Sequence, residues 1–248
     1  MTAEMSSSNG LTETAPDPDL VAGSKILEEA ARAAAVPVQR LSDTLLRCGE
    51  TAGIIFYGLT GQTCGRSAEM LCSNDAWLRA HLADQGLPVV ACQLRDVAAG
   101  DTAGAAAAAL GFPLRLRPAL ADQPVYEVAG PEELPQAWRA VADGLPPRAQ
   151  LLLEQAPVAQ ELHLAVVAGR VVAGTPDSAP SAEVADLALR AVELLPGAQY
   201  ASVEFRVTEA GAWIYRVDPL LRRWARHPEP AARIAAAILA TELGQPPE

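Results

Sequence analysis

At Leu110-Gly-Phe-Pro-Leu-Arg-Leu-Arg117-Pro118 an alanine-rich helix gives way to a short strand. Gly111 can adopt the left-handed conformation that ends a helix, and Pro113 prevents the helix from resuming. Leucine and arginine then alternate with the period of a strand, so one face is expected to be buried and the other to carry two guanidinium groups. Such a pair is most often a solvated face, but two adjacent cations also suit a phosphate-binding wall.

The composition limits the kinds of protein that this chain can be. Half of its 248 residues are hydrophobic, which allows a substantial core, and its net charge of -11 argues against a nucleic-acid surface. The start of the chain lacks the basic and apolar parts of a signal peptide, and no apolar run is long enough to span a bilayer. Four cysteines without metal-finger spacing predict reduced thiols. We expect a cytoplasmic protein that binds neither nucleic acid nor membrane.

Helices and strands alternate without a repeated parallel unit. Ser24 is expected to cap the first helix, after a disordered tail over residues 1–20. The expected helices cover residues 24–36, 67–85, 102–110, 131–143, 182–195 and 230–243. The expected strands cover residues 36–41, 51–59, 87–92, 114–117, 124–128, 150–154, 161–167, 171–173, 201–207 and 213–217. This order predicts an α+β protein of two lobes rather than a doubly wound sheet.

The order of these elements, over roughly residues 24–243, resembles the ATP-grasp fold, in particular cyanophycin synthetase and glutathione synthetase-like carboxylate–amine ligases. The matching words are Gln85-Gly-Leu-Pro-Val, Leu110-Gly-Phe-Pro, Leu151-Leu-Leu-Glu154, Val166-Val-Ala-Gly-Arg-Val-Val-Ala, Ala201-Ser-Val-Glu204 and Ile214-Tyr-Arg-Val-Asp218-Pro. The resemblance implies two lobes with antiparallel sheets and a shortened N-terminal βα segment. It divides the chain into a tail (1–20), an N-terminal pre-ATP-grasp-like segment (21–72), a small nucleotide-covering lobe (73–147) and a large lobe (148–248).

Enzymes of this family activate a carboxylate with ATP to an acyl phosphate, which an amine then attacks. The resemblance implies nucleotide contacts at Arg117, Leu153, Glu154 and Glu161, and a metal held by Glu204 and Asp218. From the residues alone, Glu154 is as readily an ordinary acid at a strand end. An ion pair with nearby Arg216 is the stronger expectation for the two metal candidates.

The sequence departs from the family where phosphate and metal are bound. Lys25 is the only lysine of the chain, so the lysine expected after Cys72 falls at Asn74 or Asp75, and the later one is Arg117. The glycine-rich flap falls in residues 119–124, which contain no glycine, and the segment 174–182 is short for the large lobe. Arg216 replaces the first acid of the metal pair, and the expected asparagine is Asp218. One cation is thus lost from the phosphate positions, Arg117 could still hold a phosphate, and Arg216 adds a cation at the metal position.

Three functions remain open, and so does the question of whether the chain is an enzyme. The first is a pseudoenzyme that acts as a binding or regulatory partner in amino-acid or peptide ligation. Its arginines, Arg216 and Arg222 above all, would bind a small anion, an amino acid or an acidic peptide without metal, although such a cluster can also be a solvated surface. The second is a divergent ATP-dependent carboxylate–amine ligase that uses ATP and Mg²⁺. The third is a structural subunit that docks an active ligase or another protein.

Overall fold

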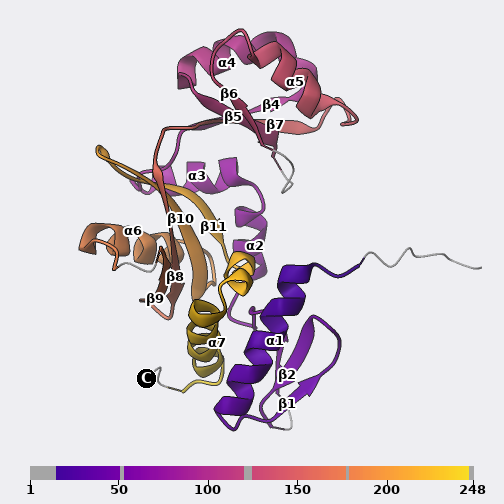
Figure 1. The fold of residues 1–248 in the computed structure, drawn as a ribbon, viewed down its shortest axis with the longest axis vertical. Coiled ribbons are helices and arrows are strands. Elements are labelled where there is room, and N and C mark those ends of the chain that lie inside the picture. The colour runs from indigo at the N-terminus through magenta and orange to yellow at the C-terminus, as the bar shows by residue number, and fades with distance from the viewer. Residues whose placement is uncertain (1–14, 51–52, 120–124, 177–178, 246–248) are drawn as a thin grey trace, which may run out of the picture.

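The structure, a computed structural model, describes residues 15–50, 53–119, 125–176 and 179–245. Three antiparallel sheets follow one another along the long axis of the molecule (Figure 1). The lower sheet has the order β1-β2-β3, the middle sheet β11-β10-β8-β9, and the upper sheet β4-β7-β5-β6. The middle and upper sheets form two lobes, and the candidate site lies between them. The two-lobed α+β architecture with antiparallel sheets that the sequence predicts is confirmed.

Secondary structure covers most of the described residues. The helices are α1 (Pro18–Ala33), α2 (Arg66–Cys72), α3 (Asp75–Asp84), η1 (Val97–Thr102), α4 (Ala103–Leu110), α5 (Leu134–Ala142), α6 (Ala182–Glu193), η2 (Arg222–Arg226) and α7 (Pro228–Glu242), where η marks a 3-10 helix. The strands are β1 (Val38–Arg40), β2 (Leu45–Cys48), β3 (Ile54–Tyr57), β4 (Cys92–Asp96), β5 (Leu114–Pro118), β6 (Tyr126–Val128), β7 (Gln150–Gln155), β8 (Gln160–Val167), β9 (Arg170–Thr175), β10 (Tyr200–Thr208) and β11 (Gly211–Asp218).

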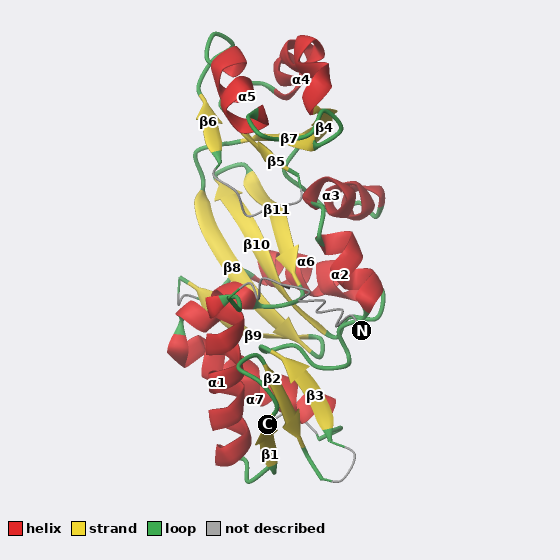
Figure 2. Cartoon of the chain, turned by 90° about the vertical axis from the view of Figure 1, so that its right-hand side faces the viewer, coloured by secondary structure: helices red, strands yellow, loops and turns green. Residues whose placement is uncertain are grey.

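The upper lobe places its two helices on one side of its sheet. Helices α4 and α5 cover the face that points away from the middle sheet (Figure 2). Leu114, Leu116, Leu151 and Leu153 pack with Trp138 of α5 in a core under these helices. Since strand side chains alternate between faces, the neighbours of these leucines point toward the other lobe. The strand expected at 114–117 is therefore confirmed, but Arg117 is buried between the lobes and not on a solvated face.

One face of the middle sheet is apolar, and the opposite face is apolar at one end and polar at the other. Helix α6 packs on the apolar face, where Leu164, Val203 and Phe205 belong to its core. On the opposite face, α7 covers only the end that begins with Tyr200 and Val167. The other end of that face carries polar side chains, because every second residue of β10 from residue 202 onward is polar. An apolar stretch near α7 thus gives way to a polar stretch near the upper lobe.

The N-terminal segment packs against the C-terminal helix. Helices α1 and α7 lie side by side, and the lower sheet closes a shared core with Leu27, Phe56, Trp224 and Ile238 (Figure 1). At the other end of α7, Glu242 accepts hydrogen bonds from the Thr63 backbone N–H at 2.8 Å and from the Tyr200 hydroxyl at 2.9 Å. None of the helices in the described part of the chain combines the length and apolar character needed to cross a membrane.

The first helix begins earlier than the sequence predicts. Helix α1 starts at Pro18, and the Asp17 side chain caps it, so residues 18–20 form its first turn and not part of the expected tail. Residues 1–14 lie outside the described ranges. Ser24 is not a cap: it is buried within α1, and its hydroxyl donates a hydrogen bond to the Thr44 carbonyl oxygen at 2.9 Å. The buried hydroxyl ties α1 to the turn before β2.

Three other boundaries differ from the prediction. The helix expected at 67–85 breaks into α2 and α3, because the Asn74 side chain accepts hydrogen bonds from the backbone N–H groups of residues 76 and 77 and starts a new helix. The strand expected at 87–92 is reduced to an isolated parallel bridge between Val89 and Ile214, and β4 follows it. Strand β7 pairs with β4 and β5, so the upper lobe extends past the boundary expected at 147.

Candidate functional site

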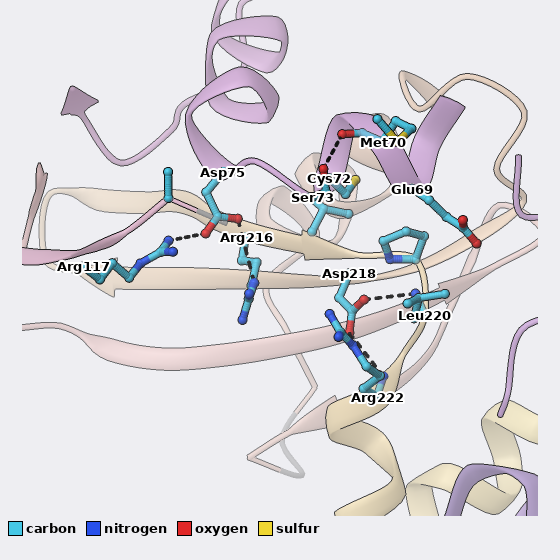
Figure 3. A pocket seen from close by; sticks show the side chains of 13 residues that line it. Glu69, Met70, Cys72, Ser73, Asp75, Arg117, Arg216, Asp218, Leu220 and Arg222 are labelled. Atoms are coloured by element: carbon cyan, nitrogen blue, oxygen red, sulfur yellow. Dashed lines mark hydrogen bonds and ion pairs between the residues drawn. The ribbon is translucent and has the colours of Figure 1, made fainter. Parts of the chain in front are cut away.

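A cavity of about 380 Å³ lies between the lobes, bordered by α2, the first turn of α3, β5 and the end of β11 (Figure 3). Six charged side chains line it: Glu69, Asp75, Arg117, Arg216, Asp218 and Arg222. Half of them are acids and half are arginines. The structure therefore brings together Arg117, Arg216, Asp218 and Arg222 of the residues expected from the sequence, and adds two acids to them.

A β-bulge shapes the wall that β11 contributes. Glu204 of β10 pairs with Arg216 and Phe205 pairs with Ile214, so Tyr215 is an extra residue between two pairs. Ile214 and Val217 both enter the core under α6. The bulge consequently places two consecutive side chains, Tyr215 and Arg216, on the side of the upper lobe.

Glu154 is the centre of a buried charge cluster beside the cavity. Its side chain is 0 % exposed, and that of Arg79 is 1 % exposed, with 2.8 Å between Arg79 Nη2 and Glu154 Oε2. Arg117 Nε lies 3.6 Å from Glu154 Oε1, and the Tyr215 hydroxyl donates a hydrogen bond to the same oxygen at 3.3 Å. Both carboxylate oxygens thus have partners within the protein.

The charges around Glu154 determine its protonation. Burial alone would raise the pKa of the Glu154 carboxyl, but the guanidinium groups of Arg79 and Arg117 outweigh burial and lower this pKa below its ordinary value. Arg79 comes from α3, which packs on β11, whereas Glu154 comes from the upper sheet. This ion pair therefore links the two lobes.

Asp75 forms a second link at the edge of the cavity. It is the first residue of α3, only 3 % exposed, and forms an ion pair with Arg117 of the upper sheet. Its other oxygen, Oδ1, is buried without a hydrogen-bond partner and lies 3.8 Å from Arg216 Nε. Figure 3 shows Asp75 between the two arginines, so one carboxylate faces a cation from each lobe.

Glu161 lies on the polar end of the middle sheet and outside the cavity. It is paired with Arg206 on the neighbouring strand and forms an ion pair with it. The Arg206 guanidinium carbon lies 4.7 Å from the centre of the Tyr215 ring, and that of Arg79 lies 5.0 Å from it. Glu161 and Glu154 are therefore connected through Tyr215, which no sequence prediction included. Leu153 does not join them, because its side chain is buried in the core of the upper lobe.

The two expected metal ligands have arginine partners. Glu204 is 2 % exposed, and its Oε2 lies 3.3 Å from Arg223 Nη1. Asp218 accepts backbone hydrogen bonds from Leu220 at 3.0 Å and Arg222 at 3.2 Å, and the Arg222 Nε lies 3.7 Å from its Oδ2. Burial raises the pKa of the Glu204 carboxyl, and the nearby arginines oppose this rise without cancelling it.

This donor set does not fit Mg²⁺. Magnesium takes a near-octahedral shell of oxygen ligands, usually with carboxylates and substrate phosphates. Within residues 15–50, 53–119, 125–176 and 179–245, no group of three or more His, Cys, Asp or Glu residues could hold a metal ion. Arg216 lies opposite Glu204 in the register of β11 and β10, so a fixed positive charge lies where the resemblance placed the metal.

Comparisons with known proteins agree with this architecture. No family model matches the sequence, and no curated protein matches it. Solved structures do match the fold. The ligase PsnB complexed with a minimal precursor has a TM-score of 0.55 at 14 % identity, over 71 % of this chain and 62 % of PsnB. A RimK domain protein from Sphaerobacter thermophilus has a TM-score of 0.54 at 23 % identity, over 70 % of this chain and 69 % of the other.

A third match includes the nucleotide. The D-alanine–D-alanine ligase from Bacillus anthracis complexed with ATP has a TM-score of 0.54 at 15 % identity, over 73 % of this chain and 69 % of that ligase. All three matched proteins are described as ATP-grasp proteins or ligases. The chain has an ATP-grasp fold. Sequence identity at this level establishes the ATP-grasp fold and nothing about activity, and the chain spans less than two thirds of the PsnB chain.

Proposed function

We propose that this ATP-grasp-like protein is a pseudoenzyme, which binds a ligand in amino-acid or peptide ligation and does not catalyse ligation with magnesium and ATP. One observation carries the proposal: the charged side chains expected at the nucleotide and metal positions lie beside groups of opposite charge within the protein. Glu154 pairs with Arg79 and Arg117, Glu161 with Arg206, and Asp218 with Arg222. The charged groups expected to contact ATP therefore already have partners within the protein.

The adenine side of the nucleotide position supports this reading. A nucleotide that needs a free acceptor on Glu154 must displace Arg79 or Arg117 from a carboxylate that is completely buried. Separating one partner from a buried ion pair costs roughly 3–5 kcal/mol. ATP binding there would have to overcome this cost before any affinity remained.

The phosphate side supports it in a different way. Phosphoryl transfer needs fixed positive charge around the transferred group, supplied by cationic side chains and metal ions. Arg117 can hold a phosphate through its planar guanidinium. In this protein, however, Asp75 and Glu154 both lie beside Arg117, so its charge is already compensated. The cavity as a whole carries equal numbers of acids and arginines.

The fold and the composition support a proposal for the partner and the location. PsnB has been solved in complex with the precursor peptide PsnA2, so a protein of this fold can hold a peptide. For the present chain we infer an amino acid, a peptide or a small anion as ligand, with an active ligase or another protein as a further partner. The cytoplasm suits its four free cysteines, because thiols stay reduced there.

A divergent ligase that uses ATP and Mg²⁺ is the second candidate function. It is favoured by Arg117, whose side chain reaches from the upper sheet into the cavity between the lobes. In that case Asp75 would move away on ATP binding and release Arg117 for the phosphates. A structural subunit that docks a partner is the third candidate, and it requires no ligand in the cavity.

Calorimetric titration of ATP into the purified protein, with and without Mg²⁺, separates the first two functions. We expect no heat of binding in either case, and no ATP-dependent phosphate release with pairs of amino acids. Magnesium-dependent binding at micromolar strength, about -8 kcal/mol, would overturn the pseudoenzyme. Such binding should then be lost in Arg117→Ala and retained in Arg226→Ala, because Arg226 is exposed and pairs with Asp19 outside the cavity.

A further inference from the structure

The middle and upper lobes have separate apolar cores. Leu78, Leu164 and Val203 belong to the core around the middle sheet, and Leu116 and Leu153 belong to the core of the upper lobe. Among the described residues, none belongs to both cores. Folded units without a large apolar interface are expected to move relative to one another. Other contacts between the lobes must therefore decide whether the cavity between them is open or closed.

Short segments of the chain connect the lobes. Residues 85–91 lead from α3 to β4, and residues 156–159 lead from β7 back to β8. The first segment is fixed to β11 as far as Val90, whose N–H donates a hydrogen bond to the Ile214 carbonyl oxygen at 2.9 Å. The second segment carries Val158, which is 97 % exposed. A few loop residues of this kind can act as a hinge, beyond Val90 in the first segment and around Val158 in the second.

Four buried side chains, Asp75, Arg79, Arg117 and Glu154, form ion pairs between the lobes, and we call them the interlobe latch. Asp75 and Arg79 come from α3, on the side of the middle sheet, whereas Arg117 and Glu154 come from the upper sheet. Each lobe thus supplies one acid and one arginine. The four side chains are at most 7 % exposed. The Tyr215 hydroxyl of β11 adds a hydrogen bond to Glu154 at 3.3 Å.

We propose that the interlobe latch holds the two lobes closed in the absence of any ligand and so controls access to the cavity. This inference goes beyond the proposed function and rests on it only in taking the cavity as the ligand site. Asp75 and Arg117 line the cavity, and Figure 3 shows the Arg117 side chain reaching Asp75. Separation of the lobes therefore separates these two groups and widens the cavity.

The closed arrangement depends on the balance of charge within the latch. Loss of the Glu154 charge leaves Arg79, whose side chain is 1 % exposed, without the carboxylate that compensates it. A buried charge that has lost its partner is costly. Opening at the hinge exposes the guanidinium group to water and relieves this cost. Removal of one acid from the latch should therefore shift the protein from the closed to the open arrangement.

Single-molecule energy transfer in the full chain measures the arrangement of the lobes. Dyes attached through azido amino acids at the exposed Gln136 of α5 and Glu193 of α6 place one dye on each lobe. Without ATP, Mg²⁺ or any other ligand, we expect one narrow distribution of transfer efficiency. A broad distribution, or an open population as large as the closed one, would overturn the proposal. This measurement needs no change to the latch, so it does not depend on the folding of a latch variant.

Two variants test whether the latch is the cause. Glu154→Gln should raise the ratio of open to closed molecules by at least about tenfold, and Asp75→Asn should raise it as well. Glu242→Gln is the matched control, because Glu242 accepts hydrogen bonds from Thr63 and Tyr200 at the end of the middle sheet far from the upper lobe. Folded latch variants with the same ratio as this control would refute the latch.

Failure of the latch is distinguishable from failure of the proposed function. Magnesium-dependent binding of ATP in calorimetry overturns the pseudoenzyme, whatever the arrangement of the lobes. A wild-type protein that is open in the energy-transfer measurement and binds no ATP overturns only the latch.

Discussion

Replacement of Arg79 by leucine should destabilise the protein strongly, and the loss should depend on Glu154. The substitution removes the closest cation from a carboxylate that has no access to solvent. It also removes the hydrogen bond from Arg79 Nε to the Tyr215 carbonyl oxygen at 2.9 Å. Arg117 remains 3.6 Å from the Glu154 carboxylate and still compensates part of its negative charge.

The size of the effect follows from these contacts. Removal of one partner from a buried ion pair costs about 3–5 kcal/mol, and a lost hydrogen bond adds about 1 kcal/mol. Since Arg117 stays close, we place the loss for Arg79→Leu near the lower end, at about 3 kcal/mol at pH 7. In Arg79→Leu with Glu154→Leu, no buried charge is left uncompensated at this position, so the double variant should lose only about 1–2 kcal/mol.

Urea unfolding of the wild type, both single variants and the double variant measures this coupling. Equal losses for Arg79→Leu and the double variant would show that the ion pair does not carry the effect and would refute the reasoning. Arg79→Lys is the matched control because it keeps a positive charge, and its loss should be smaller than that of Arg79→Leu. Circular dichroism confirms that each variant is folded before unfolding.

The pH dependence gives a second readout of the same pair. The pKa of Glu154 is lowered in the folded wild type. Its ionised form therefore stabilises the protein at pH values above the pKa of the unfolded chain, about 4.3, and this stabilisation is lost as pH falls through the folded pKa. Without Arg79 this pKa rises, and protonation relieves the uncompensated charge at mildly acidic pH. The difference in unfolding free energy between wild type and Arg79→Leu should therefore shrink from pH 7 to pH 4.5.

Four further perturbations test other parts of the structure by urea unfolding. Burial raises the pKa of Glu204, so its ionisation opposes folding as pH rises. The unfolding free energy of Glu204→Gln minus that of the wild type should therefore be more positive at pH 8 than at pH 4.5. Tyr200→Phe should cost about 1–3 kcal/mol, since the hydroxyl accepts from the Gly61 N–H at 2.6 Å and donates to a carboxylate. Leu114→Ala, in the core of the upper lobe, should cost about 2–5 kcal/mol. Arg226→Gln should change stability by less than about 1 kcal/mol, since its ion pair is exposed.

Local sequence signals predicted most of the elements because each has a local physical cause. Gly111 has a positive φ of 79° and ends α4 as expected, and the leucines that alternate with arginines in β5 enter the core. Two predictions were wrong for a related reason: Ser24 does not cap α1, and the helix expected at 67–85 breaks before Asp75. Ser24 and Asn74 are both good caps by type, and only packing decides that Ser24 bonds to Thr44 inside a helix while Asn74 starts one.

The candidate site was harder to predict because its main contacts join residues far apart in the chain. Arg79 lies between the buried Leu78 and Leu82 in α3, so an arginine near an apolar stripe was the one signal for a buried cation. Nothing local indicates that its partner is Glu154, in another lobe. Tyr215 and Arg216 point to the same side only because of the bulge opposite Glu204 and Phe205, and strict alternation would have separated them.

The substitutions at the nucleotide and metal positions have a common electrostatic consequence. The resemblance expects a lysine at Asn74 or Asp75. The acid at position 75 would repel phosphate, but here it compensates Arg117, and an arginine at position 216 would exclude magnesium, but here it lies beside Asp75. Each change alone would leave a buried charge without a partner, whereas together they leave the cavity with balanced charges. Arg79 extends this balance to Glu154, so the pairs that we propose to oppose ATP binding also link the two lobes. Asp75→Lys alone should therefore lower the free energy of unfolding in urea, because it removes a carboxylate from the buried Arg117, and should produce no heat of ATP binding in calorimetry.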